Sequence, residues 1–293
     1  MAHDEHPEWA RVNRAHWDEL VDVHLASAMY DLADLRGGAG RLVAIDEVEL
    51  PLIAPEGWKG LRVLHLQCHF GADSLVFAQR GAAVVGLDFS MPAVKRARAL
   101  ADELGLSEQA RFVCANLYDA RHALPEPESF DVVYTSWGTI GWLPDIAEWA
   151  RIIAWFLKPG GRLYFADGHP AALVFDEPLP DAPAALLDGG PAQFPSARFG
   201  YFDETPLDID EDGDYADADA HVTNSRTIEF MHPLGATVTA LIDAGLTIDF
   251  LHEHDAVPWQ MFSVLERRDV DGVWAWPATA WLPLGMSLAA TRR

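Results

Sequence analysis

The sequence predicts an α/β protein built on a doubly wound, mostly parallel sheet of seven strands, with an antiparallel last strand and a small β-rich insertion. Between residues 62 and 166, five short apolar runs alternate with stretches of helical spacing, which is typical of parallel strands joined by crossover helices. The alternation returns once near the C-terminus. The last apolar run has no helix before it long enough for a parallel crossover, so we expect it to pair antiparallel.

The seven expected strands are the runs 62–66, 83–87, 111–115, 131–135, 162–166, 246–252 and 283–291. Helices between them carry ordinary start and stop signals. Ser90 is a suitable N-cap, Pro92 suits a first helical turn, and Gly105 ends the apolar periodicity that follows them. Further helices are expected over 143–157 and 233–244, and the first fifty residues also have a helical pattern.

The chain divides into three parts. Residues 1–58 are expected to form a helical cap over the turn that follows the first strand. Residues 59–167 and 231–293 form the core. Residues 168–230 are rich in Pro, Asp and Gly and contain no long helical pattern, so we interpret them as an inserted segment with one or two hairpins, near 199–208 and 221–230. The cap and the insertion together should enclose a substrate.

Composition excludes several partners. Lys and Arg number 21 against 45 Asp and Glu, a formal net charge of −24. Such a surface repels phosphate backbones and anionic lipid headgroups, so neither a nucleic acid nor a membrane is an expected partner. The N-terminus lacks the apolar run of a signal peptide, and Cys68 and Cys114 are too few for a disulfide framework. We therefore expect a cytoplasmic protein that acts on a small molecule; the oligomeric state stays open.

Residues 61–90 are the most informative segment. An apolar strand runs into a tight turn at Gly71, and a second strand ends in Asp88. This unit places a helix N-terminus and a carboxylate on either side of one crevice, where a nucleoside can lie with its sugar against the acid. The turn has one glycine where a dinucleotide-binding turn has three.

Several spaced motifs resemble the class I S-adenosylmethionine-dependent methyltransferases, chiefly the bacterial small-molecule type with an LHLQCHFG first motif. That motif occupies residues 64–71 and is followed by Asp88 at the family's ribose-binding position. Asn116 and Leu117 match the pair that meets the adenine. The run FDVVY at 130–134 and the turn LKPGG at 157–161 also resemble the family.

The resemblance implies a Rossmann-like methyltransferase fold and S-adenosyl-L-methionine as the cofactor. It assigns a set of side chains to that cofactor, namely Trp17, Tyr30, His65, Gln67, His69, Gly71, Asp88, Phe89, Asn116, Leu117 and Ser136. Among these, Trp17 and Tyr30 belong to the cap, where an aromatic ring can cover a sulfonium or simply pack.

Three positions depart from the family pattern. His65 stands where the family has an acid, and Gln67 and His69 stand where it has glycines. The backbone of Gln67 can serve the methionine amino group as a glycine would. His69 adds a side chain where the backbone must approach the ligand, and His65 cannot provide the negative charge of an acid.

Residues expected to contact the substrate lie just beyond strands four to six or in the insertion. Trp137 and Trp142 flank the tip of the fourth strand, while Tyr201 and His254 are further candidates. His169 follows the fifth strand and is the candidate general base, because the pKa of a histidine suits proton transfer near neutrality. A role in packing alone would explain each of these side chains equally well. No metal site is expected, since only two histidines, His252 and His254, share a strand face.

The expected reaction is methyl transfer from S-adenosylmethionine to a nitrogen or oxygen nucleophile of a small molecule, with carbon as a third option. Two alternatives stay open. A nicotinamide-dependent oxidoreductase shares the β–α–β unit and the ribose acid. A non-catalytic, nucleoside-binding regulatory protein on the same scaffold is compatible with the missing glycines.

Overall fold

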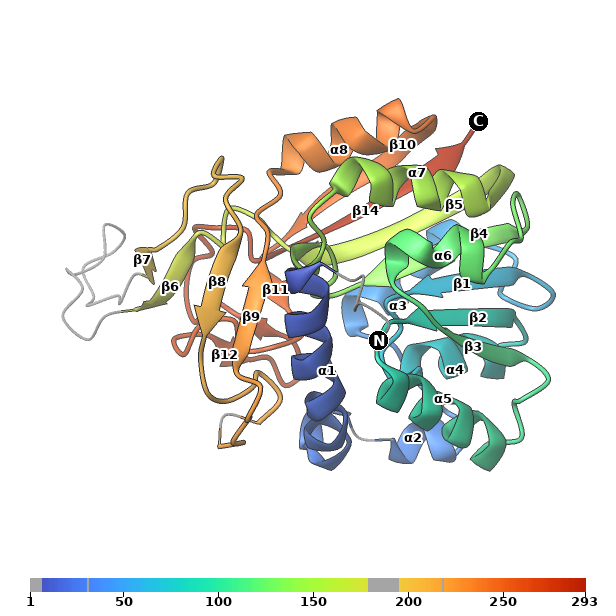
Figure 1. Cartoon of the computed structure of the whole chain (residues 1–293), viewed down its shortest axis with the longest axis horizontal. Coiled ribbons are helices and arrows are strands. Elements are labelled where there is room, and N and C mark those ends of the chain that lie inside the picture. The colour runs from blue at the N-terminus through green and yellow to red at the C-terminus, as the bar shows by residue number, and fades with distance from the viewer. Residues whose placement is uncertain (1–6, 31, 179–194, 218) are drawn as a thin grey trace, which may run out of the picture.

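A seven-stranded sheet forms the centre of the molecule, with helices on both faces (Figure 1). The computed structural model describes residues 7–30, 32–178, 195–217 and 219–293. The strand order is β10-β14-β5-β4-β1-β2-β3. The bounds are β1 (Arg62–Leu66), β2 (Ala83–Asp88), β3 (Ala110–Cys114), β4 (Phe130–Ser136), β5 (Leu157–Gly168), β10 (Leu246–His254) and β14 (Gly285–Arg292).

Strand directions confirm the predicted fold class. Strands β3, β2, β1, β4 and β5 are parallel neighbours, whereas β14 runs antiparallel to both β5 and β10. The predicted strand positions agree with those observed to within a few residues, except that β5 begins earlier, at Leu157, because the LKPGG turn is part of it.

Two apolar layers hold helices on opposite faces of the sheet. Val63 of β1 packs into one layer and its neighbour Leu64 into the other, as alternation along a strand requires. The first layer includes α2 (Ala33–Arg36), α3 (Ala44–Ile53), α4 (Ala72–Gln79) and α5 (Met91–Glu103). The second includes α6 (Ala120–Ala123), α7 (Ile146–Phe156) and α8 (Leu234–Asp243). Short 3-10 turns are η1 (Ala28–Tyr30), η2 (Leu117–Asp119) and η3 (Ile140–Trp142).

Three small antiparallel sheets lie beyond the carboxyl ends of the central strands (Figure 1). Strand β6 (Phe175–Pro178) pairs with β7 (Pro195–Ala197), and β8 (Leu207–Asp210) pairs with β9 (Arg226–Glu229). The insertion is therefore β-rich, as predicted, but its two expected hairpin segments pair with each other. The third sheet, β11-β13-β12, lies between β10 and β14 in the chain and was not predicted; its strands are β11 (Ala256–Val257), β12 (Glu266–Arg267) and β13 (Trp274–Ala275).

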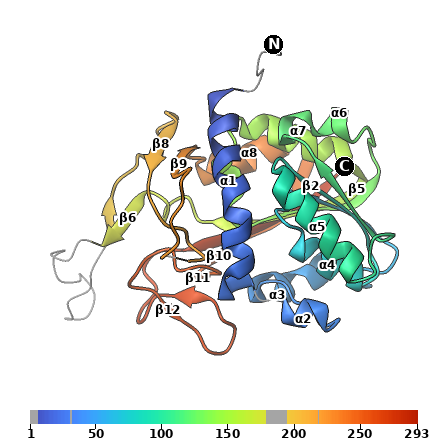
Figure 2. The same cartoon turned by 60° about the horizontal axis from the view of Figure 1, so that its bottom comes forward.

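The N-terminal helix α1 (Glu8–Ala26) connects the insertion to the core. Figure 2 shows it running between β9 and α5, and it contacts both. The fully buried Asn13 holds it to β9: its amide Nδ2 donates to the Ile228 carbonyl at 2.7 Å, and the Ile228 N–H donates to Asn13 Oδ1 at 2.8 Å. Glu19 accepts the backbone N–H groups of Thr223 and Asn224. The helix thus satisfies backbone groups that would otherwise need a neighbouring strand.

No helix in the described ranges is both long enough and apolar enough to cross a membrane.

Gly71 is the one position of the β1–α4 turn at which a side chain has no room. Its φ is 77°, and a Cβ atom there would lie 2.5 Å from the Phe112 ring. We expect Gly71→Ala to lower the free energy of unfolding by about 3 kcal/mol, because left-handed strain and overpacking add. Gly105→Ala is the matched control: Gly105 has a φ of 68° with nothing within 4 Å of its Cβ position, so strain alone should cost about 1 kcal/mol. Equal losses in urea unfolding would contradict the packing argument.

Candidate active site

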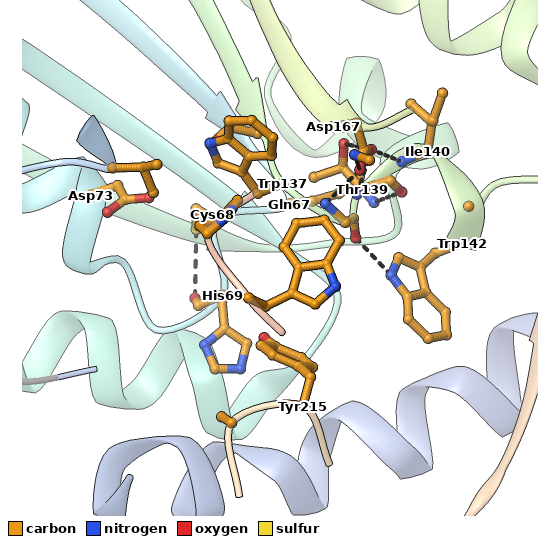
Figure 3. A pocket seen from close by; sticks show the side chains of 18 of the residues that line it. Gln67, Cys68, His69, Asp73, Trp137, Thr139, Ile140, Trp142, Asp167 and Tyr215 are labelled. Atoms are coloured by element: carbon orange, nitrogen blue, oxygen red, sulfur yellow. Dashed lines mark hydrogen bonds between the residues drawn. The ribbon is translucent and has the colours of Figure 1, made fainter. Parts of the chain in front are cut away.

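A cavity of about 950 Å³ lies at the carboxyl ends of the central strands, and Figure 3 shows side chains that line it. Its walls come from the cap, the turn after β1, the ends of β2 to β5, the insertion and the β11-β13-β12 sheet. Every residue predicted to contact a cofactor lines it: Trp17, Tyr30, His65, Gln67, His69, Gly71, Asp88, Phe89, Asn116, Leu117 and Ser136. The fold therefore gathers that whole set around one space.

The turn after β1 keeps a glycine-turn backbone although two of its glycines are absent. Gln67, His69 and Gly71 all have left-handed φ values, of 56°, 50° and 77°. The left-handed region costs a residue with a side chain about 1–2 kcal/mol, so it persists only where the surroundings enforce it. Gln67 and His69, which stand where glycines were expected, thus share the left-handed backbone conformation of Gly71.

Side-chain contacts hold this strained turn in place. Gln67 Nε2 donates to the Thr139 carbonyl at 2.8 Å, which ties the turn to the loop after β4. The imidazole of His69 packs against the rings of Trp17 and Tyr30, at centroid distances of 5.5 and 6.2 Å. Its two ring nitrogens are buried and have no hydrogen-bond partner among the described residues, and the same is true of Gln67 Oε1.

Asp88 ends β2 and holds two backbone groups with its two oxygens. Oδ2 accepts the His69 N–H and Oδ1 accepts the Ser90 N–H, each at 2.8 Å. Burial raises the pKa of Asp88 to about 6, although both hydrogen bonds oppose this shift and the charge of Asp18 adds to it. Each carboxylate oxygen retains a lone pair, so Asp88 can still accept hydrogen bonds from sugar hydroxyls.

Asn116 and Leu117 occupy the end of β3. Asn116 Oδ1 accepts the Tyr118 N–H at 3.0 Å and so caps η2. The Asn116 Nδ2 group has no acceptor among the described residues. Because Oδ1 is held by the Tyr118 N–H, Nδ2 remains available as a hydrogen-bond donor to a ligand in the cavity. Leu117 is buried beside it and offers an apolar face.

His65 does not supply the charge of the acid that it replaces. Its Nδ1 lies 2.9 Å from Ser74 Oγ, and its ring packs edge-on against Tyr134. Burial lowers the pKa of His65 to about 3, so the imidazole is neutral near pH 7.

Two acids of the cavity were not predicted from the sequence. Asp73, in the first turn of α4, lines the cavity and makes no hydrogen bond or ion pair within the described part of the chain. Burial raises its pKa to about 6; the charge of Glu47 adds to this shift and that of Arg80 opposes it. An acid two residues beyond the Gly71 turn was the available signal.

Asp167, near the end of β5, organises the loop after β4. Its carboxylate accepts the N–H groups of Gly138 at 2.7 Å, Thr139 at 2.9 Å and Ile140 at 3.2 Å, as well as that of Gly168. Burial raises the pKa of Asp167, and these backbone hydrogen bonds oppose the shift. The signal that could have identified it is an Asp-Gly pair at the end of a predicted strand.

Aromatic rings cover the cavity. Trp17 of α1 meets Trp142 edge-on at 5.3 Å, and Tyr30 and Tyr215 join hydroxyl to hydroxyl at 2.6 Å. Trp137 has a φ of 51°, and its Nε1 donates to Asp46, which also accepts the Tyr134 hydroxyl. The predicted wall residues Trp137 and Trp142 both line the cavity.

The other predicted substrate and catalytic residues point elsewhere, and none is among the described residues that line the cavity. His169 Nδ1 accepts the Ala171 N–H, and its Nε2 lies 3.1 Å from Glu253. The Tyr201 hydroxyl accepts the Leu234 N–H, and His254 Nε2 lies 2.8 Å from Ser287 Oγ. Local contacts thus engage these three side chains, and their predicted roles gain no support from the cavity lining. His232 and Glu229 line the cavity instead.

Across the described ranges, no group of three or more His, Cys, Asp and Glu side chains is arranged to hold a metal ion. His252, one of the two histidines considered from sequence, directs its Nδ1 to Glu49 at 2.8 Å.

Residues 63–161 match the model of a methyltransferase-domain family. The chain is 33% identical over 135 residues to a ubiquinone biosynthesis O-methyltransferase of Aeromonas salmonicida, covering 45% of this chain and 55% of that protein. The chain spans about half the length of the curated relatives it matches.

Solved structures share the fold over most of the chain. A putative S-adenosylmethionine-dependent methyltransferase from Listeria monocytogenes superposes with a TM-score of 0.57 at 19% identity, covering 88% of this chain and 98% of that one. Magnesium protoporphyrin IX methyltransferase from Synechocystis PCC 6803, solved with S-adenosylmethionine bound, gives 0.53 at 16% identity and covers 99% and 100%.

The architecture is therefore the Rossmann-like fold of the class I S-adenosylmethionine-dependent methyltransferases. Together with the domain match, it makes the chain similar to methyltransferases, among them one solved with the cofactor S-adenosylmethionine bound. The cavity fits this cofactor: a carboxylate and an amide face it at the ends of β2 and β3, and Gln67 and His69 leave buried polar atoms without protein partners.

Replacing Asp73 by Asn should stabilise the ligand-free protein at high pH only. Its folded pKa of about 6 exceeds the ordinary value of 3.8, so folding disfavours the charged form. Wild-type stability should accordingly fall as the pH rises from about 4 to about 6 and stay lowered above that. We expect Asp73→Asn to gain on the order of 2 kcal/mol at about pH 8 and nothing near pH 4, measured by urea unfolding. The exposed Asp34→Asn should show no such dependence; a similar gain there would refute the burial argument.

Asp167→Ala should destabilise the protein strongly, because four backbone N–H groups lose their acceptor. We expect a loss of about 3 kcal/mol or more in urea unfolding. Asp271→Ala provides the comparison, since Asp271 also lines the cavity but accepts only the Val273 N–H, at 3.3 Å. A loss for Asp167→Ala no larger than that for Asp271→Ala would show that the carboxylate is not what holds the loop.

Proposed function

We propose that this enzyme transfers a methyl group from S-adenosylmethionine to a nitrogen, oxygen or carbon nucleophile of a small molecule by direct displacement. The observation that carries the proposal is the continuity of the cavity. One space joins the Asp88–Asn116 edge to an aromatic wall that includes Trp142, Phe230 and Trp259. A cofactor and an acceptor molecule can therefore lie end to end within it.

We assign the adenosine to the ends of β2 and β3. Asp88 would accept hydrogen bonds from the ribose hydroxyls beside Phe89, and Asn116 and Leu117 would meet the adenine. The left-handed turn at Gln67 to Gly71 would bring its backbone against the methionine portion. Support comes from the agreement between the family pattern and the residues lining the cavity.

When bound, the cofactor supplies a methyl group made electrophilic by the sulfonium. The protein then has to align a nucleophile and exclude water, and proximity of this kind provides a large share of the rate. Trp17 and Tyr30 from the cap and Tyr215 from the insertion line the cavity, and these apolar rings would help to exclude water from a bound cofactor.

Oxygen is the favoured acceptor, because the curated relatives are named as O-methyltransferases. A hydroxyl acceptor gains from a general base, and we assign this role to His232 in place of His169. His232 Nε2–H donates to the Leu143 carbonyl at 2.6 Å, and burial lowers its pKa, so the imidazole is neutral and able to accept a proton. The chain charge of −24 favours a small molecule over a nucleic acid, and a cytoplasmic location is part of the same proposal.

Ligand binding tests the proposal and separates it from the two alternatives. We expect S-adenosylhomocysteine, but not NAD, to raise the thermal unfolding midpoint, since a ligand that binds only the folded state stabilises it. Asp88→Ala should lose most of that rise relative to its own ligand-free midpoint, while Asp131→Ala, outside the cavity, should keep it. Stabilisation by NAD alone would favour an oxidoreductase. Cofactor binding without methyl transfer to any of a broad panel of phenols, amines, acids and thiols would favour a regulatory protein.

A further inference from the structure

We propose that Asp73 replaces the missing strand-end acid and holds the ammonium group of the methionine portion of the cofactor. The inference rests on the proposed function, because it assumes that S-adenosylmethionine occupies the cavity. It addresses the feature in which this chain departs from its family: the first strand ends without an acid, so the positive ammonium has no counter-charge from β1.

His65, at the family's usual position for the strand-end acid, cannot supply a negative charge to the ammonium group. His65 is buried, its Nδ1 is engaged with Ser74, and its imidazole is neutral near pH 7. The nearby acid Asp46 is fully buried, and its two oxygens accept the Tyr134 and Tyr164 hydroxyls at 2.5 and 2.9 Å. Neither side chain offers a free negative charge to a ligand.

Among the described acids that line the cavity, Asp73 is the one whose carboxylate has no donor. Asp88 accepts two backbone N–H groups, and Asp167 accepts four. Glu229 accepts the Thr227 hydroxyl, and Asp271 accepts the Val273 N–H. A desolvated carboxylate without donors costs stability, and an incoming cation would offset that cost.

The position of Asp73 suits the methionine end rather than the adenosine end. Its charge raises the pKa of Asp46 on α3, Tyr134 on β4 and Tyr30 in the cap. Asp73 lies in the first turn of α4, directly after the turn that follows β1, whereas Asn116 follows β3, two strands away in the sheet. In Figure 3 Asp73 and Trp142 lie on opposite sides of the view, with Gln67 and Cys68 between them.

The cavity lining also includes a positive side chain, the exposed Arg41. Arg41 forms no ion pair within the described ranges. The residues on either side hold Arg41 between two helices: the Gly40 N–H donates to Gln79 of α4, and the Leu42 N–H donates to Glu47 of α3. Methionine is a zwitterion, and opposite charges from α4 and from the α3 loop match its two charged groups.

Calorimetric titration with three ligands tests the inference. S-adenosylhomocysteine has both charged groups, its decarboxylated analogue S-(5′-adenosyl)-3-thiopropylamine keeps only the ammonium, and 5′-methylthioadenosine has neither. We expect Asp73→Asn to weaken the first two about 10- to 100-fold, the range for a hydrogen bond to a charged group, and to leave the third unchanged within about twofold. Asp34→Asn is the control, because Asp34 is an exposed acid of α2 outside the cavity, and its replacement should change none of the three.

Each outcome decides the matter. Equal weakening of all three ligands by Asp73→Asn would mean a general disturbance of the site and would overturn the inference, as would no weakening of S-adenosylhomocysteine. Weakening of S-adenosylhomocysteine with no effect on the decarboxylated amine would also overturn it, since the lost partner would then be the carboxylate. Failure of the wild-type protein to bind S-adenosylhomocysteine would instead refute the proposed function, so the two failures are distinguishable.

Discussion

The ring of Phe112 sets the spacing on which the Asp88 end of the cavity depends. A Cβ atom on Gly71 would lie 2.5 Å from this ring, and one on Gly86 would lie 2.6 Å from it. The two glycines therefore let β3 press against both β2 and the turn after β1. That close approach allows the His69 N–H to reach the Asp88 carboxylate, 2.8 Å away. A larger residue at either glycine would separate the turn from the acid.

Gln67 and His69, in place of glycines, make the left-handed turn less favourable for the backbone but add side-chain contacts that hold it. A glycine would adopt the same left-handed angles without strain, but it would have no side chain to hold the turn. Gln67 ties it to the Thr139 carbonyl, and Thr139 in turn donates its N–H to Asp167 at the end of β5. The ends of three strands are thereby linked across the floor of the cavity. The departures from the family pattern are thus consistent with a well-ordered turn.

The sequence predicts the framework well because the framework follows from repeated patterns. Apolar periodicity locates the central strands, and parallel strands place their carboxyl ends along one edge, so residues such as Asp88 and Asn116 were expected to meet. The orientation of a side chain cannot be predicted from its position after a strand. His169 also follows a strand at this edge, but its imidazole lies against Glu253. Two-residue strands such as β11 and β13 have no period to detect, so that sheet and Trp274 in the cavity wall were missed.

The acids at and beside the cavity serve two different purposes, and their hydrogen-bond donors distinguish them. Asp46 and Asp167 are surrounded by hydroxyl, indole or backbone donors, which offset the cost of burial and fix Trp137 and the loop after β4. Their role is complete within the protein. Asp73 is only partly buried, lines the cavity and accepts no hydrogen bond within the described residues, so its carboxylate is available to a ligand. A cavity acid that has no hydrogen-bond donor of its own is one whose site a cationic ligand can complete.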